Sequence, residues 1–164
     1  MPVLVVVDMQ PRFEASNCEQ TINACATLIK RFRRKNWPII ILEYIGNGQS
    51  HQCLLDLIKG YRLGVVSEKN FDDGSSVIYD VCDTKQFDTD EFHVCGVNLG
   101  ACVRSTISGM KNLFPKSGIH LYKNACNQPN TGFWASYTVE DELYKIRSWD
   151  VKISDVRITA KVAA

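Results

Sequence analysis

Residues 92–106 read Phe-His-Val-Cys-Gly-Val-Asn-Leu-Gly-Ala-Cys-Val-Arg-Ser-Thr. The apolar run from Phe92 to Val97 predicts a buried strand, and residues 100–113 predict a helix. A strand that turns directly into a helix places the first helical residues at the carboxyl edge of a sheet, where backbone N–H groups and the helix dipole favour an anion. Cys102 lies at that point, so we expect a bias toward the nucleophilic thiolate. The alternative is a buried structural cysteine.

The rest of the chain repeats this alternation of apolar runs and amphipathic stretches. Strands are expected at 3–7, 38–42, 64–67, 92–97, 119–122 and 149–153, and helices at 17–35, 53–59, 73–83, 100–113 and 138–146. Near-continuous apolar strands separated by helices predict a sheet covered on both faces. We therefore expect one domain, 1–164, with a Rossmann-like α/β fold: a three-layer α-β-α sandwich around a central, mostly parallel sheet. The tail from Arg157 is expected to fray or to dock on a partner subunit.

The composition is ordinary for a soluble domain. Hydrophobic residues make up 45% of the 164 residues, charged residues 23%, and the net charge is +1, so we expect neither a nucleic acid nor a membrane as partner. No apolar run is long enough for a transmembrane span, and the first residues do not resemble a signal peptide. The basic cluster Lys30 to Lys35 is typical of a solvated helix end. The seven cysteines show no CxxC spacing, which favours reduced thiols in the cytoplasm.

Three chemically distinct side chains follow predicted strands. Asp8 ends the first strand, Lys69 closely follows a short one, and Cys102 follows the strand that ends at Val97. Parallel strands joined by right-handed crossovers bring their carboxyl ends to one edge, so we expect the three to converge. An ammonium group stabilises a thiolate, and a carboxylate can take the thiol proton and return it to a leaving group. Singly, Asp8 could be a cap and Lys69 a surface lysine.

Three segments of the sequence resemble the isochorismatase-like cysteine hydrolases, which include nicotinamidases and N-carbamoylsarcosine amidase-like enzymes. They are Val7-Asp8-Met9-Gln10 with Phe13, Ser67-Glu68-Lys69 with Asn70-Phe71, and Gly96 to Thr106. The resemblance implies Cys102 as nucleophile, Asp8 as general base and Lys69 as the charge that lowers the cysteine pKa. It also implies a cis peptide between Val97 and Asn98, with the N–H groups of Asn98 and Cys102 forming an oxyanion hole. Oligomers are usual in this family, so a homo-oligomer, a dimer or a multiple of dimers, is expected.

Departures from the family pattern bear on the substrate. Leu99 replaces the usual threonine, and Asn98 stands where nicotinamidases often have a small residue. Nicotinamidases carry an Asp-x-His metal site after the second strand, whereas residues 43–51 offer only Glu43 and a lone His51. A zinc site needs three or four ligands, so we expect no metal and no other cofactor. His93 and His120 lie on predicted strands and are expected to be packed.

Aromatic residues near the predicted edge are candidates for a pocket. Phe13, Tyr44 and Phe71 are expected to line the site of a small-molecule substrate, and Phe133 with Trp134 to contribute to a subunit interface. These features together favour hydrolysis of a C–N bond in a small amide, ureide or carbamoyl compound through a thioester. Two alternatives stay open: a vinyl-ether hydrolase of the isochorismatase type, and a non-enzymatic α/β protein that binds a small ligand.

Overall fold

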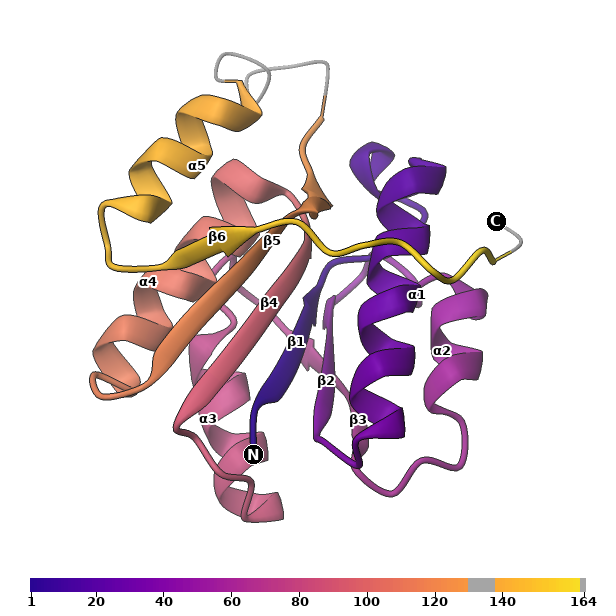
Figure 1. Ribbon diagram of the computed structural model, residues 1–164, viewed down its shortest axis with the longest axis horizontal. Coiled ribbons are helices and arrows are strands. Elements are labelled where there is room, and N and C mark those ends of the chain that lie inside the picture. Colours follow the sequence, from indigo (N-terminus) through magenta and orange to yellow (C-terminus); the bar gives the residue numbers. More distant parts are fainter. Residues whose placement is uncertain (130–137, 163–164) are drawn as a thin grey trace.

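A computed structural model describes residues 1–129 and 138–162. Six parallel strands form the centre in the order β3-β2-β1-β4-β5-β6 (Figure 1). They are β1 (Val3–Val7), β2 (Ile39–Tyr44), β3 (Gly64–Lys69), β4 (Glu91–Val97), β5 (Gly118–Asn127) and β6 (Lys152–Ser154). All five residues of β1 are buried, because the sheet is covered on both faces. The predicted α/β fold with a parallel sheet is confirmed.

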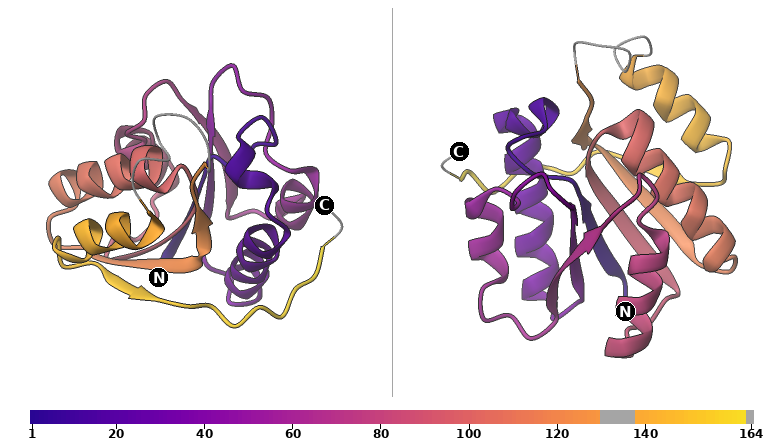
Figure 2. Two further views of the ribbon diagram at one scale, coloured as in Figure 1. Left: turned by 90° about the horizontal axis from the view of Figure 1, so that it is seen from above. Right: turned by 180° about the vertical axis from the view of Figure 1, so that it is seen from behind.

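Helices form a layer on each face of the sheet. α1 (Glu19–Arg34) and α2 (Gln52–Ile58) lie on one face; α3 (Ser75–Lys85), α4 (Arg104–Leu113) and α5 (Val139–Arg147) lie on the other (Figure 2). Side chains alternate along β1 accordingly: Val3, Val5 and Val7 pack in the core under α3, α4 and α5, whereas Leu4 and Val6 pack in the core under α1. The two cores hold the strand ends, and hence the residues that follow them, in fixed positions.

The strand order opens a crevice beside β1. The chain runs from β1 outward to β2 and β3, then returns to place β4 on the other side of β1. Ligands of open α/β sheets bind at such a switch point, outside the carboxyl ends of the two diverging strands. Asp8 follows β1 and Asn98 follows β4, so both lie at this crevice.

Gly96 allows β1 and β4 to approach closely at the switch point. Its φ is +124°, and a Cβ placed there would lie 2.1 Å from the carbonyl oxygen of Val7. A side chain is therefore excluded by both backbone conformation and space. The pairing of β4 with β5 also changes register between Val94 and Gly96, as expected where a strand bends.

Two segments differ from the sequence prediction. The helix expected from residue 100 begins as a π-helical turn, η2 (Leu99–Val103), and becomes α4 only at Arg104. Residues 157–162 of the tail lie against the chain's own α1, where the N–H groups of Thr159 and Ala160 donate to the Thr27 hydroxyl; docking of the tail on a partner subunit stays a prediction. Unmet backbone donors of the tail thus find acceptors on the chain's own helix.

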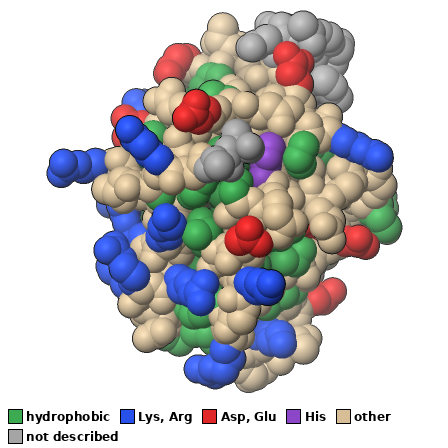
Figure 3. All heavy atoms as spheres, turned by 90° about the vertical axis from the view of Figure 1, so that its right-hand side faces the viewer, with side chains coloured by type: hydrophobic (Ala, Val, Ile, Leu, Met, Phe, Trp, Pro, Cys, Tyr) green, Lys and Arg blue, Asp and Glu red, His purple; other side chains and the backbone are tan. Residues whose placement is uncertain are grey.

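The basic cluster lies at the end of α1, whose last turn carries Arg31, Arg33 and Arg34. Figure 3 views the right-hand side of Figure 1 and shows Lys and Arg side chains gathered over its left and lower part. Lys30 and Lys35 are exposed, and Lys35 Nζ also lies 4.2 Å from the ring centroid of Trp37. The predicted solvated helix end is confirmed. Within the described residues, no helix is both long and apolar enough to cross a membrane.

Candidate active site

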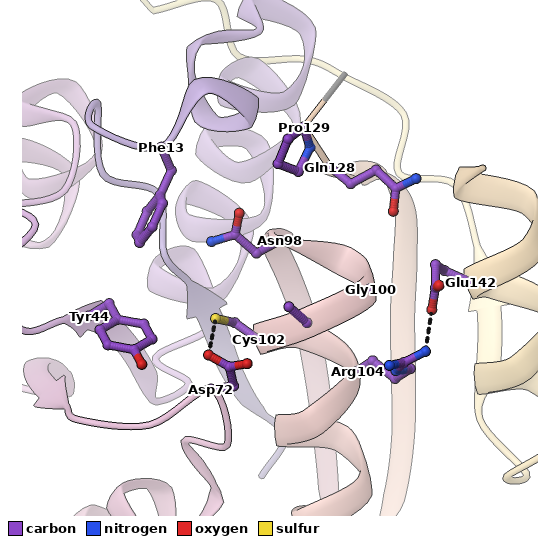
Figure 4. A pocket seen from close by; sticks show the side chains of 11 residues that line it. Phe13, Tyr44, Asp72, Asn98, Gly100, Cys102, Arg104, Gln128, Pro129 and Glu142 are labelled. Atoms are coloured by element: carbon purple, nitrogen blue, oxygen red, sulfur yellow. Dashed lines mark hydrogen bonds and ion pairs between the residues drawn. The ribbon is translucent and has the colours of Figure 1, made fainter. Parts of the chain in front are cut away.

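A cavity of about 260 Å³ lies at the carboxyl ends of the strands. Its walls combine two aromatic rings, several small or apolar groups and a few polar side chains (Figure 4). The lining residues are Phe13, Tyr44, Asp72, Asn98, Gly100, Ala101, Cys102, Arg104, Gln128, Pro129 and Glu142. This volume is slightly below the usual range of about 300–1,000 Å³ for ligand sites, so it suits a small molecule.

Asp8 and Lys69 form a buried ion pair beside this cavity. Asp8 Oδ1 lies 3.2 Å from Lys69 Nζ, with the two side chains 0% and 1% exposed. Asp8 has a left-handed φ of 55°, which Asp tolerates better than most residues. Its Oδ2 accepts a hydrogen bond from Asn98 Nδ2 at 3.0 Å, whereas Oδ1 accepts no hydrogen bond from any described residue. Although ion-paired, Oδ1 therefore has lone-pair capacity for an incoming proton.

The end of β3 supplies Lys69. Its ammonium donates to the carbonyl oxygens of Phe71 at 3.0 Å and Asp72 at 3.4 Å, and it lies 4.1 Å from the ring centroid of Tyr44. A buried charge is costly unless it is paired and hydrogen-bonded. Here one carboxylate, two carbonyls and an aromatic face together offset that cost.

Cys102 lies in the π-helical turn, and its side chain reaches the cavity. Its Sγ is 3.7 Å from Asp72 Oδ1 and the residue is 4% exposed. Burial raises the pKa of the Cys102 thiol above its usual value. The charge of Asp8 and a hydrogen bond between Cys102 and Asp8 raise this pKa further, and the charge of Asp72 does so to a smaller extent. The charge of Lys69 lowers it. The predicted bias toward thiolate is therefore wrong for the free protein, because desolvation and two carboxylates outweigh one ammonium.

The three sequence-predicted groups thus lie together at one edge. Asp72 was not predicted from the sequence, nor were Gly100, Ala101, Arg104, Gln128, Pro129 and Glu142. One signal was available for Asp72: it is a carboxylate in the short loop after β3, where the strand-end rule already placed Lys69. No motif marks Gln128 or Glu142, which come from later elements of the chain.

Of the aromatic candidates, two line the cavity and one does not. Phe13 and Tyr44 form an edge-to-face pair with ring centroids 6.3 Å apart. Phe71 is absent from the lining and is 75% exposed. The prediction for Phe71 is wrong because β3 is an edge strand: the Phe71 carbonyl turns inward to Lys69 while its side chain remains in solvent.

The chain reversal after β4 is made without a cis peptide. Every peptide bond in residues 1–129 and 138–162 is trans, including Val97–Asn98, so that prediction is wrong. Asn98 instead adopts φ 61° and ψ 51°, a left-handed conformation that asparagine tolerates. Its carbonyl accepts from the N–H groups of Ala101 and Val103, which flank Cys102. The oxyanion role of the Asn98 and Cys102 N–H groups stays a prediction.

The end of β2 and the loop after it do not fit a metal ion of the kind nicotinamidases hold. Glu43 Oε1 accepts the Ser50 N–H at 2.7 Å, and His51 Nε2 shares a 3.1 Å hydrogen bond with the Ser16 hydroxyl. The two candidate ligands are thus already engaged with the protein. No group of three or more His, Cys, Asp or Glu side chains in the described part of the chain is arranged to hold a metal ion.

No family model and no curated protein matches the sequence. Solved structures match the fold. A nicotinamidase from Staphylococcus aureus shares 15% identity, with a TM-score of 0.79, over 95% of this chain and 98% of its own. An N-carbamoylsarcosine amidase from Thermoplasma acidophilum shares 19% identity, with a TM-score of 0.65, over 94% of this chain and 95% of its own. The Escherichia coli YcaC gene product, an octameric hydrolase of unknown specificity, shares 14% identity, with a TM-score of 0.73, over 94% of this chain and 74% of its own. The chain therefore has the fold of the isochorismatase-like hydrolases.

Proposed function

We propose that the protein is a cysteine hydrolase that cleaves a C–N bond of a small amide, ureide or carbamoyl compound. The observation that carries the proposal is the buried Asp8–Lys69 pair, 3.2 Å apart, beside a cavity lined by Cys102 at the switch point of the sheet. A nucleophile, a proton acceptor and a fixed positive charge in one cavity are the components of acyl transfer. Solved hydrolases of small amides with this fold support the same chemistry.

In the proposed reaction the Cys102 sulfur attacks the substrate carbonyl carbon while the thiol proton passes to Asp8 Oδ1. The raised pKa of the thiol makes this transfer part of the attack rather than a step before it. The N–H groups of Asn98 and Cys102 are proposed to bind the oxyanion. Collapse breaks the C–N bond, the nitrogen takes the proton from Asp8, and a thioester remains. Water then hydrolyses the thioester, giving the acid and restoring the thiol.

Lys69 and Asn98 hold Asp8 for this exchange. Lys69 neutralises the Asp8 carboxylate through Oδ1, and the Asn98 amide fixes Oδ2. Oδ2 already accepts a hydrogen bond from Asn98, whereas Oδ1 is ion-paired but accepts no hydrogen bond among the described residues, so Oδ1 is the proposed proton acceptor. Positioning of this kind lowers the barrier because the reacting groups need little reorganisation.

The test is a panel of small amides, ureides and carbamoyl compounds assayed for released ammonia. Cys102→Ala is expected to lower kcat/KM by at least about 10³-fold, because a thioester mechanism has no substitute for the nucleophile. Cys18→Ala, which removes an exposed thiol, is the matched control and should act like wild type. Burial of so small a side chain contributes at most about 1–2 kcal/mol to the free energy of unfolding, and Cys102→Ala should therefore remain folded. The urea midpoint of the variant checks this. Wild-type turnover in Cys102→Ala would refute the proposal.

Three further proposals accompany this one. Turnover should survive EDTA, because Glu43 and His51 are engaged elsewhere; activity lost to EDTA and restored by zinc would contradict this. A homo-oligomer is proposed from the family resemblance and the octameric YcaC product, and sedimentation as a single 18.5 kDa species would exclude it. Phe133 and Trp134, which the sequence predicts to contribute to the subunit interface, lie outside the described residues. The cytoplasm is proposed from the cysteine pattern of the sequence.

A further inference from the structure

Asp72 places a carboxylate in the cavity wall directly beside the nucleophile. The Cys102 thiol donates to its Oδ1 at 3.7 Å, and Figure 4 shows the two side chains facing each other with the Tyr44 ring nearby. The pKa of the Tyr44 phenol is raised by burial first and then by the negative charge of Asp72. The Asp72 backbone is fixed as well, because its carbonyl accepts from the Thr106 hydroxyl at 3.2 Å and from Lys69 Nζ at 3.4 Å.

The charge of Asp72 has no ionic counterpart among the described residues. The other carboxylates at the site are paired: Asp8 with Lys69 at 3.2 Å, and Glu142 with both Arg104 at 2.9 Å and Lys145 at 3.3 Å. No salt bridge within residues 1–129 and 138–162 involves Asp72. The end of the cavity that holds the thiol therefore carries an excess of one negative charge.

We propose that Asp72 is the specificity-determining residue of this site, selecting amides that carry a positive charge near the scissile carbonyl and rejecting those that carry a carboxylate there. This inference rests on the proposed function only in naming the substrate as an amide. A cation would complete an ion pair that the protein leaves open, and a neutral amide N–H can donate to the same oxygens. A carboxylate would meet like charge in a confined space.

The same arrangement gives a positively charged substrate a second advantage. Asp8 and Asp72 both raise the pKa of the thiol in the free protein. A cation seated against Asp72 cancels one of these two charges at the moment the sulfur must lose its proton. Charge selection would therefore appear in the reactivity of the thiol as well as in binding.

The first experiment measures the pocket charge without relying on hydrolysis. The full-length protein reacts with two methanethiosulfonates of similar size, one bearing trimethylammonium and one bearing sulfonate, and labelling of Cys102 is followed by mass spectrometry. Each reagent forms a mixed disulfide with the sulfur and releases methanesulfinate, while the thiol proton passes to solvent. We expect the cationic reagent to react faster, and Asp72→Asn to lower the cation-to-anion rate ratio by roughly tenfold, the scale for losing one nearby charge in a half-solvated site.

Asp73→Asn is the matched control. It removes the next carboxylate along the chain, which caps the Ser75 N–H at 2.8 Å and is absent from the cavity lining. Asparagine keeps that capping ability, and the ratio should stay within about twofold of wild type. Asp72→Ser provides a second neutral variant of different size. A ratio unchanged in both Asp72 variants, with wild-type urea midpoints, overturns the proposal.

A second experiment compares β-alaninamide, butyramide and succinamate, three primary amides of matched length that are cationic, neutral and anionic. Wild type should hydrolyse them in that order of kcat/KM, and Asp72→Asn should narrow the spread of kcat/KM among the three amides. An order in which succinamate leads overturns the charge selection. If wild type hydrolyses no amide at all, the proposed function fails, and the reagent ratio at Cys102 still decides the role of Asp72.

Discussion

Replacing Lys69 with methionine should test whether the Asp8–Lys69 pair is a buried, obligatory unit. Methionine keeps most of the aliphatic stem of lysine but removes the charge and the hydrogen bonds to the carbonyls of Phe71 and Asp72. The Asp8 carboxylate, 0% exposed, would then lie in the core with only uncharged hydrogen-bonding groups beside it, the Asn98 amide and the Cys102 thiol. It must either stay charged without compensation or take up a proton.

The size of the effect follows from the geometry. Two unit charges 3.2 Å apart interact by about 5 kcal/mol at an effective dielectric constant of about 20. Removing one partner of a buried pair typically costs about 3–5 kcal/mol, because the other charge stays buried. We therefore expect Lys69→Met to lower the free energy of unfolding by about 4 kcal/mol. Asp8→Asn should cost less, since Lys69 keeps two carbonyl acceptors and the Tyr44 ring.

The assay is urea unfolding at pH 7 of wild type, the two single variants and the double variant Asp8→Asn/Lys69→Met. The double variant should recover part of the loss, with a coupling energy of about 2–3 kcal/mol. That coupling should change little between 0.15 M and 1 M salt, because buried pairs are poorly screened. A cost below about 1 kcal/mol for Lys69→Met, as found for exposed pairs, would refute the reasoning.

Three further outcomes are expected. Gly96→Ala should lower the free energy of unfolding in urea by roughly 3 kcal/mol or more, because the new Cβ would lie 2.1 Å from the Val7 carbonyl oxygen. The control Gly46→Ala places a Cβ with nothing within 4 Å and should show only backbone strain; equal losses in the two variants would contradict this. Alkylation of Cys102 by iodoacetamide should keep rising above pH 9, because its pKa is raised, and a plateau near pH 7 would contradict the burial argument. Burial, followed by the charges of His93 and Lys152, lowers the pKa of His120 to about 4. As the pH falls, the imidazole of His120 therefore takes up a proton in the unfolded chain before it does so in the folded protein, and the free energy of unfolding should fall by at most about 3 kcal/mol between pH 7 and pH 4. His120→Gln should reduce this pH dependence, and an unchanged slope would exclude His120 as its source.

The sequence was sufficient where a single rule governed the outcome. Continuous apolar runs such as Val3 to Val7 occur where both faces of a strand are covered, so the parallel sheet followed. Once strands are parallel, residues at or after their carboxyl ends share an edge of the sheet, and this rule predicts that Asp8, Lys69 and Cys102 lie in one region. The helix expected at 138–146 is present as α5, and Thr138 and Asp141 form a capping box at its first turn.

The remainder depended on packing, which no local pattern contains. The pKa of the Cys102 thiol is raised first by burial, then by the charge of Asp8 and a hydrogen bond to it, and last by Asp72, a residue 30 positions away in sequence. The side chain of Phe71 is exposed because β3 is the edge strand, which only the strand order reveals. The family resemblance predicted a cis peptide between Val97 and Asn98, whereas Asn98 reverses the chain with a trans peptide and a left-handed conformation of its own.

The backbone, more than the side chains, determines where the reacting groups lie. Asp8 and Asn98 directly follow the neighbouring strands β1 and β4, both have left-handed φ angles, and their side chains join by a 3.0 Å hydrogen bond. Strained conformations of this kind cost about 1–3 kcal/mol each and persist only where surrounding structure enforces them. The close approach of β1 and β4 at Gly96 supplies that enforcement. A site fixed by strand pairing can keep its geometry while the residues of its walls change, and the proposed selection of substrate by Asp72 depends only on such a wall residue. Solved structures that are 14–19% identical to this chain share its fold.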